Sequence, residues 1–451
     1  MMEKNKNQND RITVRYQVRL SFFVFLAIFS SISAQDRCPL RCMCSLSHEP
    51  RKIICSSQEI ESYPSNISDL VQQLDLSRNL LTSISDEINN LFELQYLNLA
   101  NNKLESLPSD LHQLGQLHKL DLSNNKIVEI YDIVAINQLT GLKVLYLSQN
   151  PLSSLDELSN GALRALDASK CSINNITSAS LRGLPELVTL SLEGNPLKSI
   201  QRLTSEKLRW LDLSDCSLNY LKPDTFEGAP DLEQLKLSNN PTLVYSSRNE
   251  TLMHKNLKRL DVTGCNLDRP GLHGFPGLTH AILSKNLIRM LPDRIFAKND
   301  VLSQLFLHSN GLNVVNRSSF AGLSKLEILD LSSNSIARLH PFTFRENVNL
   351  RILNLSYNDF EKFPNIMSTV MTLDISSNYV QSVPRQIFTD LPRLKTLDLS
   401  DNRLEGVCDR FESVTLKNLI LKRNRLVELA NDSFSHLPSL QKLDVSGTPQ
   451  Q

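Results

Sequence analysis

The chain has 451 residues, and its 48 basic and 48 acidic side chains give a formal net charge of zero. No basic stripe stands out along the sequence, which argues against a nucleic-acid partner. Only 14 glycines and no low-complexity tract are present, which argues against long disordered linkers. The chain is long for one ordinary domain, whereas a fold built from repeats has no single core to outgrow.

Residues 1–34 have the pattern of a secretory signal peptide. Basic residues between Lys4 and Arg19 precede an apolar run over residues 20–32, and the small residues Ser33 and Ala34 follow as a cleavage site. An uncleaved membrane anchor is the alternative, but the run is shorter than the roughly 20 residues that a membrane span needs. We therefore expect a secreted, extracellular protein.

Four cysteines, Cys38, Cys42, Cys44 and Cys55, follow this segment directly. In an oxidising compartment such a cluster predicts a disulfide-stapled cap, here over residues 35–69. Four cysteines allow three pairings from sequence alone. A zinc cluster is the alternative, but Cys42 and Cys44 are separated by one residue instead of the usual spacing of about two to four.

From residue 70 to residue 451 the chain repeats one pattern with a period in the low twenties. The segment Leu326–Asn334, LEILDLSSN, has the form L-x-x-L-x-L-x-x-N. The same form begins at Leu94, Leu117, Leu302, Leu350 and Leu394. This spacing is the signature of leucine-rich repeats, each made of a short strand and a returning segment, and about seventeen repeats fit the sequence.

The repeat predicts an α/β solenoid. Alternation places Leu329 and Leu331 on one face of a strand and Asp330 on the other. Because no repeat can bury its leucines alone, stacked repeats share one apolar column. We expect a horseshoe with a parallel β-sheet on its concave face and turns with short helical or 3₁₀ segments on its convex side. Asn334 and its equivalents should satisfy turn backbone groups with their side-chain amides.

The run from Cys38-Pro39 to Cys55, followed directly by repeats, resembles the amino-terminal cap of animal extracellular leucine-rich-repeat proteins. Toll-like receptor ectodomains, matrix proteoglycans and neuronal adhesion receptors share this arrangement, and the resemblance covers nearly all of the mature chain. It implies the disulfides Cys38–Cys44 and Cys42–Cys55. Relatives usually continue into a second cysteine-rich cap, which this sequence lacks. We therefore expect a truncated receptor-like chain, or a last repeat covered by another subunit.

Cysteine replaces the turn asparagine at Cys171, Cys216 and Cys265. Cys171 and Cys216 would be two strands apart, about 10 Å at the usual strand spacing. A disulfide needs Cα atoms within roughly 7 Å, so we expect three buried free thiols. Cys408 has no obvious partner, and a buried thiol is favoured there over one that is partly exposed and open to pairing with another chain.

Aspartate recurs on the concave face between the buried leucines of each strand, as at Asp330. One explanation is a habitual, solvated residue of the repeat, partly offset by Lys119, Arg209, Arg259, Lys395 and Lys442. The other is an acidic strip that attracts basic ligands. We favour the first, because unpaired aspartates on strands about 4.8 Å apart would repel each other.

Apolar residues interrupt this face. Ile282 and Phe306 replace the aspartate in adjacent repeats, and Ile328 and Ile352 lie on the following strands. A contiguous apolar patch on a solvated face tends to mark a binding site, although single surface hydrophobic residues are normal. Aromatic anchors are common hot spots of binding. We predict that this set contacts a protein partner, together with Trp210 and Tyr146 from a sparser set that also contains Tyr96 and Val144.

Six N-glycosylation sequons begin at Asn66, Asn175, Asn249, Asn316, Asn354 and Asn431. Asn354 lies next to the predicted apolar patch. Either this sequon is unused, or its glycan shields one side of the concave surface.

No catalytic motif of the HExxH, GxSxG or phosphate-loop type is present. His280 and His308 would lie about 13 Å apart along the strand direction, too far to share a metal. We expect no enzyme activity, no metal and no cofactor. The expected function is recognition of a protein ligand or receptor ectodomain in cell adhesion or receptor–ligand signalling, and a homodimer is also open.

Two alternatives to this function remain. One is a structural component of the extracellular matrix. The other is a truncated form of a transmembrane receptor, including the innate-immune type, because the fold by itself does not choose between these roles. Contact with a membrane would then come only through a partner or a missing carboxyl-terminal segment.

Overall fold

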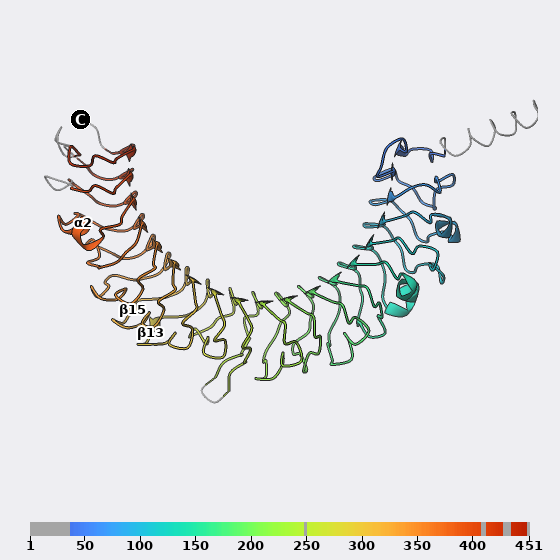
Figure 1. The fold of residues 1–451 in the computed structure, drawn as a ribbon, viewed down its shortest axis with the longest axis horizontal. Coiled ribbons are helices and arrows are strands. Elements are labelled where there is room, and N and C mark those ends of the chain that lie inside the picture. The colour runs from blue at the N-terminus through green and yellow to red at the C-terminus, as the bar shows by residue number, and fades with distance from the viewer. Residues whose placement is uncertain (1–36, 248–249, 407–411, 427–433, 449–451) are drawn as a thin grey trace, which may run out of the picture. The chain divides into compact units, whose positions relative to one another are not determined.

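The computed structural model describes residues 37–247, 250–406, 412–426 and 434–448 (Figure 1). The chain divides into two compact units, one of Met1–Cys171 with Gly183–Glu186 and the other of Ser172–Arg182 with Leu187–Gln451. Several sequence predictions lie outside the described residues. They are the signal peptide at residues 1–34, the sequons at Asn249 and Asn431, and the thiol of Cys408.

The first unit begins with an antiparallel pair and continues as a parallel sheet. β1 (Met43–Ser45) pairs antiparallel with β2 (Lys52–Ile54). From β2 the pairing is parallel through β3 (Gln73–Asp75), β4 (Tyr96–Asn98), β5 (Lys119–Asp121), β6 (Val144–Tyr146) and β7 (Ala165–Asp167). Two 3₁₀ segments, η1 (Asp86–Asn90) and η2 (Ile130–Gln138), lie in returning segments on the side away from the strands (Figure 1).

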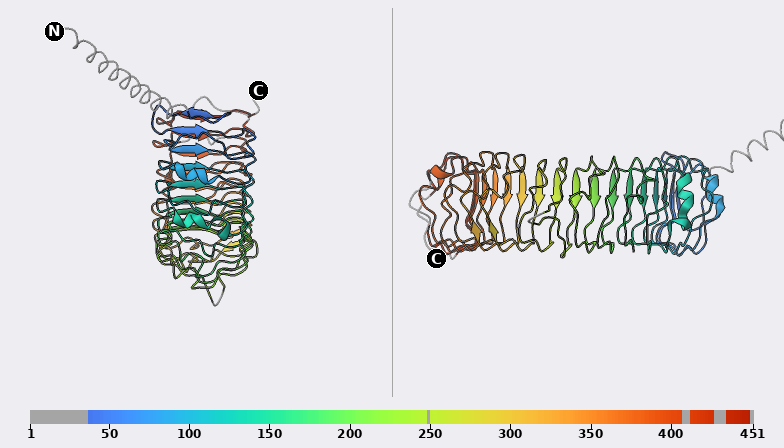
Figure 2. Two further views of the ribbon diagram at one scale, coloured as in Figure 1. Left: turned by 90° about the vertical axis from the view of Figure 1, so that its right-hand side faces the viewer. Right: turned by 90° about the horizontal axis from the view of Figure 1, so that it is seen from below.

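The second unit is a longer parallel sheet of three-residue strands, which lie side by side in Figure 2. In pairing order these are β8 (Thr189–Ser191), β9 (Trp210–Asp212), β10 (Gln234–Lys236), β11 (Arg259–Asp261), β12 (His280–Ile282), β14 (Gln304–Phe306), β16 (Ile328–Asp330), β17 (Ile352–Asn354), β18 (Thr372–Asp374), β19 (Thr396–Asp398), β20 (Asn418–Ile420) and β21 (Lys442–Asp444). A two-stranded sheet of β13 (Met290–Leu291) and β15 (Val314–Val315), and the helix α2 (Ile387–Asp390), lie in returning segments (Figure 1).

The core of each unit is a column of leucines. Leu329, at the centre of β16, lies opposite Leu305 on one neighbouring strand and Leu353 on the other. All three have an exposed fraction of 0%. Burial of each such side chain contributes roughly 1.5–3 kcal/mol, and the column forms only when repeats stack. The predicted solenoid of parallel strands with short helical returns is therefore confirmed.

The turn asparagines join each repeat to the one before it. Asn334 donates from Nδ2 to the carbonyls of Leu307 and Leu331, both at 3.0 Å, and accepts at Oδ1 from the backbone N–H of Leu312 at 3.0 Å. Asn79, Asn102, Asn125, Asn150, Asn240, Asn286, Asn310, Asn358, Asn378, Asn402 and Asn424 make equivalent side-chain bonds. These bonds satisfy backbone groups that the turn would otherwise bury unpaired, as predicted.

Cys171, Cys216 and Cys265 are buried free thiols, as predicted. The Sγ atoms of Cys216 and Cys265 lie 3.2 and 3.0 Å from the carbonyl oxygens of Leu192 and Leu237, which occupy the place of asparagine partners. Burial raises the pKa of the Cys216 thiol to about 12. These thiols therefore replace the turn amide as donors and are held in their protonated, unreactive form.

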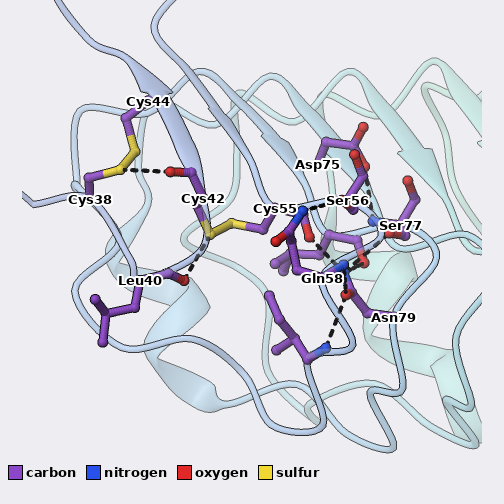
Figure 3. The surroundings of a disulfide bond; sticks show 12 residues. Cys38, Leu40, Cys42, Cys44, Cys55, Ser56, Gln58, Asp75, Ser77 and Asn79 are labelled. Carbon is purple, nitrogen blue, oxygen red and sulfur yellow. Dashed lines mark hydrogen bonds between the residues drawn. A yellow bond between two sulfur atoms is a disulfide. The ribbon is translucent and has the colours of Figure 1, made fainter.

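The cap contains the disulfides Cys38–Cys44 and Cys42–Cys55, so the pairing implied by the resemblance is confirmed (Figure 3). Cys55 is fully buried, and its backbone N–H donates to the Asp75 carbonyl at 2.8 Å. Asn79 Nδ2 donates to the Cys55 carbonyl at 2.8 Å. The second disulfide therefore ties the cap directly to the first repeat.

A second set of buried polar side chains, which we did not predict, joins the returning segments. Asn299 Nδ2 donates to the carbonyls of Leu272 and Phe275, both at 3.0 Å. Asn160 and Asn347 make the same pair of bonds one repeat back. His254 takes this position in its own repeat and donates from Nε2 to the Ala229 carbonyl at 3.0 Å.

Candidate functional site

The first and third residues of each strand flank the buried central residue and point away from the core. We call the surface that they form the sheet face, with a leading row of first residues and a trailing row of third residues. In the leading row Ile328 lies opposite Ile352, and in the trailing row Asp330 lies opposite Asn354. Figure 2 shows the strands that position these rows in the second unit.

The aspartates of the trailing row have a structural task. Asp330, Asp374 and Asp398 each accept at Oδ1 from the backbone N–H two residues later, at 2.8–2.9 Å. Asp75, Asp121, Asp167, Asp212, Asp261 and Asp444 accept the same bond. This supports the explanation that aspartate is a habitual turn residue of the repeat.

The cations expected to offset this row do so without close ion pairs. At Asp444, bonds from Ser446 and the nearby Lys422 and Lys442 lower the pKa of the carboxyl group. In the part of the chain that the structure describes, Lys119, Arg209, Arg259, Lys395 and Lys442 form no ion pair with a trailing-row aspartate. The ion pair that does involve this row joins Lys236 Nζ to Asp212 Oδ2 at 3.2 Å. Turn N–H groups, which were not considered from the sequence, donate to these aspartates directly. Burial and the nearby carboxylates of Asp398 and Asp330 raise the pKa of Asp374.

The structure brings the four predicted apolar residues onto neighbouring strands. Ile282 lies opposite Phe306 in the trailing row, and Ile328 lies opposite Ile352 in the leading row. The two pairs are offset by one row, because Phe306 lies opposite Asp330. Diagonal neighbours on adjacent strands are roughly 7–8 Å apart, within reach of an aromatic side chain. We call these four residues the apolar patch. It runs diagonally across four strands.

The exposure of the apolar patch is uneven. Ile352 is 41% exposed, and Ile282, Phe306 and Ile328 are half-buried. Ile282 and Phe306 cannot accept the turn hydrogen bond that aspartate accepts at this position, which is worth about 0.5–1.5 kcal/mol. The internal needs of the repeat therefore do not explain these two residues.

Two histidines flank the apolar patch. His280 precedes Ile282 on β12, and His308 follows Phe306 by two residues, so both share the patch's side of the sheet. Burial and the neighbouring Arg259 lower the pKa of His280, which favours its neutral form. Among the described residues no group of three histidine, cysteine or acidic side chains has the arrangement of a metal site.

Tyr146, predicted as a contact residue, belongs to a cation–aromatic cluster in the first unit. Lys119 Nζ lies 5.0 Å from the centre of the Tyr146 ring and 5.1 Å from that of Tyr96. Burial and the carboxylates of Asp121 and Asp75 raise the pKa of Tyr96 to about 12. The sequence reasoning missed the role of Lys119, although its place on the strand between the two tyrosines was visible.

Trp210 is held in a similar way in the second unit. Lys236 Nζ lies 5.5 Å from the centre of the Trp210 ring and also pairs with Asp212. Such contacts are worth about 0.5–1 kcal/mol at exposed sites. Tyr146 and Trp210, the two aromatic residues predicted as contacts, are thus each partly covered by a lysine of the same unit.

Two exposed tyrosines near the apolar patch were missed. Tyr357, just after β17, is 64% exposed and has a φ of 53°, a value uncommon for bulky residues. Tyr379, after β18, is 40% exposed, and the Arg403 guanidinium lies 4.4 Å from the centre of its ring. Alignment of the repeats could have identified Tyr357, because it stands at a turn position where the neighbouring repeats have serine, at Ser333 and Ser377.

The described sequons differ in their surroundings. Asn66 and Asn175 are exposed, and Asn316 is half-buried, all outside the strands. Asn354 is the last residue of β17 and lies on the sheet face. Its glycosylation, like that of the others, stays a prediction.

The described residues contain no helix that is both long and apolar enough to cross a membrane. The profile of the family described as "Leucine rich repeat" matches residues 69–127, 206–267, 276–336, 300–360 and 368–415. A second profile, for two copies of the repeat, matches residues 115–160. Together these matches cover more than half of the chain.

The relatives match over part of their length. Epiphycan of Homo sapiens is 31% identical over 133 residues, 29% of this chain and 41% of epiphycan. Keratocan of Danio rerio is 29% identical over 189 residues, 40% of this chain and 53% of keratocan. The human leucine-rich repeats and immunoglobulin-like domains protein 1 is 30% identical over 158 residues, 34% of this chain and 14% of that protein.

A solved structure of similar fold is the crystal structure of a TLR13–ssRNA13 complex. Its TM-score is 0.53 at 22% identity, over 91% of this chain and 68% of that chain. At this identity the likeness concerns the fold alone. The repeat profiles, the leucine column and the turn amides agree with one another. The chain therefore belongs to the leucine-rich repeat family.

Proposed function

We propose that this chain is an extracellular recognition scaffold that binds a protein partner through the sheet face of its second unit. The observation that supports this most is the apolar patch, four apolar side chains on four successive strands of a face whose trailing row holds turn-capping aspartates in many repeats. The relatives include extracellular matrix proteoglycans and receptors, for which a non-enzymatic binding role is the inference from family. The role of this chain is accordingly in cell adhesion or receptor–ligand signalling.

The proposed domain order follows the same reasoning. A signal peptide at residues 1–34 is removed, the disulfide-bonded cap occupies residues 35–69, and the repeats follow from residue 70. The two disulfides support passage through an oxidising compartment. This route places the protein outside the cell, where a protein ligand or receptor ectodomain meets the sheet face.

Phe306 is the proposed anchor of the interface. It has an apolar neighbour in its own row, Ile282, and a diagonal one in Ile328. Aromatic residues at the centre of an interface commonly account for 2 kcal/mol or more of binding free energy, which corresponds to roughly 30-fold in affinity.

In the first step the secreted protein is added to living cells and crosslinked to whatever it binds, and mass spectrometry identifies the partner. Affinity is then measured for the wild type and for Phe306→Asp and Ile328→Asp, which place a charged carboxylate on the patch. We expect at least a 30-fold loss of affinity with unchanged secretion. Asn418→Asp, on the same face but on β20, is the matched control and should bind normally. Unchanged binding by the two patch variants would refute the proposal.

A structural role in the extracellular matrix is the second candidate, favoured by the similarity to epiphycan and keratocan. Antibody staining of tissue separates the two. Fibrillar deposits away from cell borders support a matrix component, whereas staining confined to cell contacts supports the recognition scaffold.

A further inference from the structure

Asn354 stands between two aspartates of the trailing row. It lies opposite Asp330 on one side and Asp374 on the other. Its Oδ1 accepts from the backbone N–H of Ser356 at 3.0 Å and from the Ser356 hydroxyl at 2.8 Å. Asp398 receives the same two bonds from Ser400, at 2.9 and 2.6 Å. The turn therefore uses only the oxygen of the Asn354 amide.

The amide nitrogen of Asn354 has no structural role among the described residues. Its Nδ2 makes no hydrogen bond there, and the side chain is half-exposed on the sheet face. Asn358, four residues later, shows the opposite arrangement. It is 4% exposed, and its Nδ2 donates to the carbonyls of Leu331 and Leu355 at 3.0 and 3.1 Å. Of these two amides, only Asn354 can have a substituent on nitrogen without losing bonds.

We propose that Asn354 bears an N-linked glycan that projects from the sheet face. In the secretory pathway Nδ2 would attack the anomeric carbon of a lipid-diphosphate-linked oligosaccharide. The bond from that carbon to the diphosphate oxygen breaks, the lipid diphosphate leaves, and the amide nitrogen loses one proton. The product keeps the amide oxygen, so both bonds from Ser356 remain in the modified protein.

The glycan would bound the surface that a partner can reach. Asn354 shares a strand and a face with Ile352, and it lies two strands from Phe306, about 10 Å at the usual spacing. A bulky hydrated glycan would shield Ile352, on the same strand, most strongly and Ile282, three strands away, least. This consequence rests on the proposed function, whereas the modification itself does not.

The test is peptide mapping of the protein secreted by animal cells, with enzymatic glycan release in heavy-oxygen water. Release converts a glycosylated asparagine to aspartate labelled with heavy oxygen, so we expect this label at Asn354. Asn66, Asn175 and Asn316 are read in the same experiment. Label at the other sequons without label at Asn354 would overturn the inference but leave the proposed secretion of the protein intact. The absence of label at every sequon would overturn both the glycan at Asn354 and the proposed secretion.

The chain supplies matched variants for this test. Asn354→Asp and Ser356→Ala should each remove one glycan from the apparent mass, and Ser356→Thr should retain it. Other repeats already contain the substituted residues and keep the turn bond. Aspartate stands at the position of Asn354 in Asp398, with a turn bond of 2.9 Å. Alanine and threonine stand at the position of Ser356 in Ala100 and Thr263, with turn bonds of 3.1 and 3.0 Å. Normal secretion of all three variants is therefore expected, and a retained glycan in Asn354→Asp would contradict the assignment.

Shielding is tested with an added cysteine and a polymer-linked maleimide. Thr372→Cys lies opposite Ile352, whereas Gln234→Cys lies on β10, five strands from β17. Adding Asn354→Asp should raise the labelling rate at position 372 several-fold and leave that at position 234 unchanged. Equal rates at position 372 with and without the glycan would refute the shielding, independently of any partner.

Discussion

Replacement of one turn asparagine should destabilise the solenoid strongly. Asn334 is 9% exposed, and its Nδ2 lies 3.0 Å from three carbonyl oxygens, those of Leu307, Leu331 and Ser332. Nδ2 has two hydrogens, and Oδ1 accepts one further bond from Leu312. Three net bonds at about 0.5–1.5 kcal/mol each predict a loss of roughly 1.5–4.5 kcal/mol for Asn334→Ala.

Asn334→Cys should lie between the wild type and the alanine variant, because Cys216 shows that a thiol can take over part of the donation. The assay is chemical denaturation followed by circular dichroism, with the free energy of unfolding compared among variants. Asn313→Ala, at an exposed position in the returning segment that follows β14, is the control and should change stability by less than about 0.5 kcal/mol. A change equally small for Asn334→Ala would refute the bridging role of the turn amides.

Two further predictions concern stability. Burial lowers the pKa of His254 below its usual 6.5, so protonation favours the unfolded chain and stability should fall as the pH drops below about 6.5. His254→Asn, which matches Asn299, should flatten thermal stability between pH 7 and 5, and an unchanged slope would contradict this. Replacement of both Cys42 and Cys55 by serine removes their disulfide and should lower the free energy of unfolding by about 2–4 kcal/mol, measured by chemical denaturation. The control is Cys216→Ser, which removes a cysteine but leaves both disulfides intact.

Repeat spacing predicted the strands and their alignment correctly. Once Leu329 and Leu353 are placed on successive strands, Ile328 must lie opposite Ile352, and the structure has this register. The same alignment placed Ile282 beside Phe306. Side-chain direction alternates along a strand, so aligned repeats determine which residues share a face.

Side-chain partners were harder to predict. Three contacts depend on the reach of a particular side-chain atom. They are the turn bond at Asp330, the position of Lys119 between two tyrosines, and the second set of amides that contains Asn299. The period of the sequence sets the order of the repeats but not these distances. The backbone N–H groups that bond the aspartates were missed for this reason.

The sequence by itself determines that this protein is a stack of leucine-rich repeats that follows a cysteine-rich cap, because periodic leucines can be buried only when the repeats stack. The cysteine pairing followed from the family resemblance, since the spacing alone allowed three solutions. Tertiary structure alone decided which polar atoms on the sheet face are already engaged and which are free. Asn354 and Asn358 have the same side chain, yet one leaves its nitrogen open and the other uses it fully, because the carbonyls that surround each amide come from neighbouring repeats.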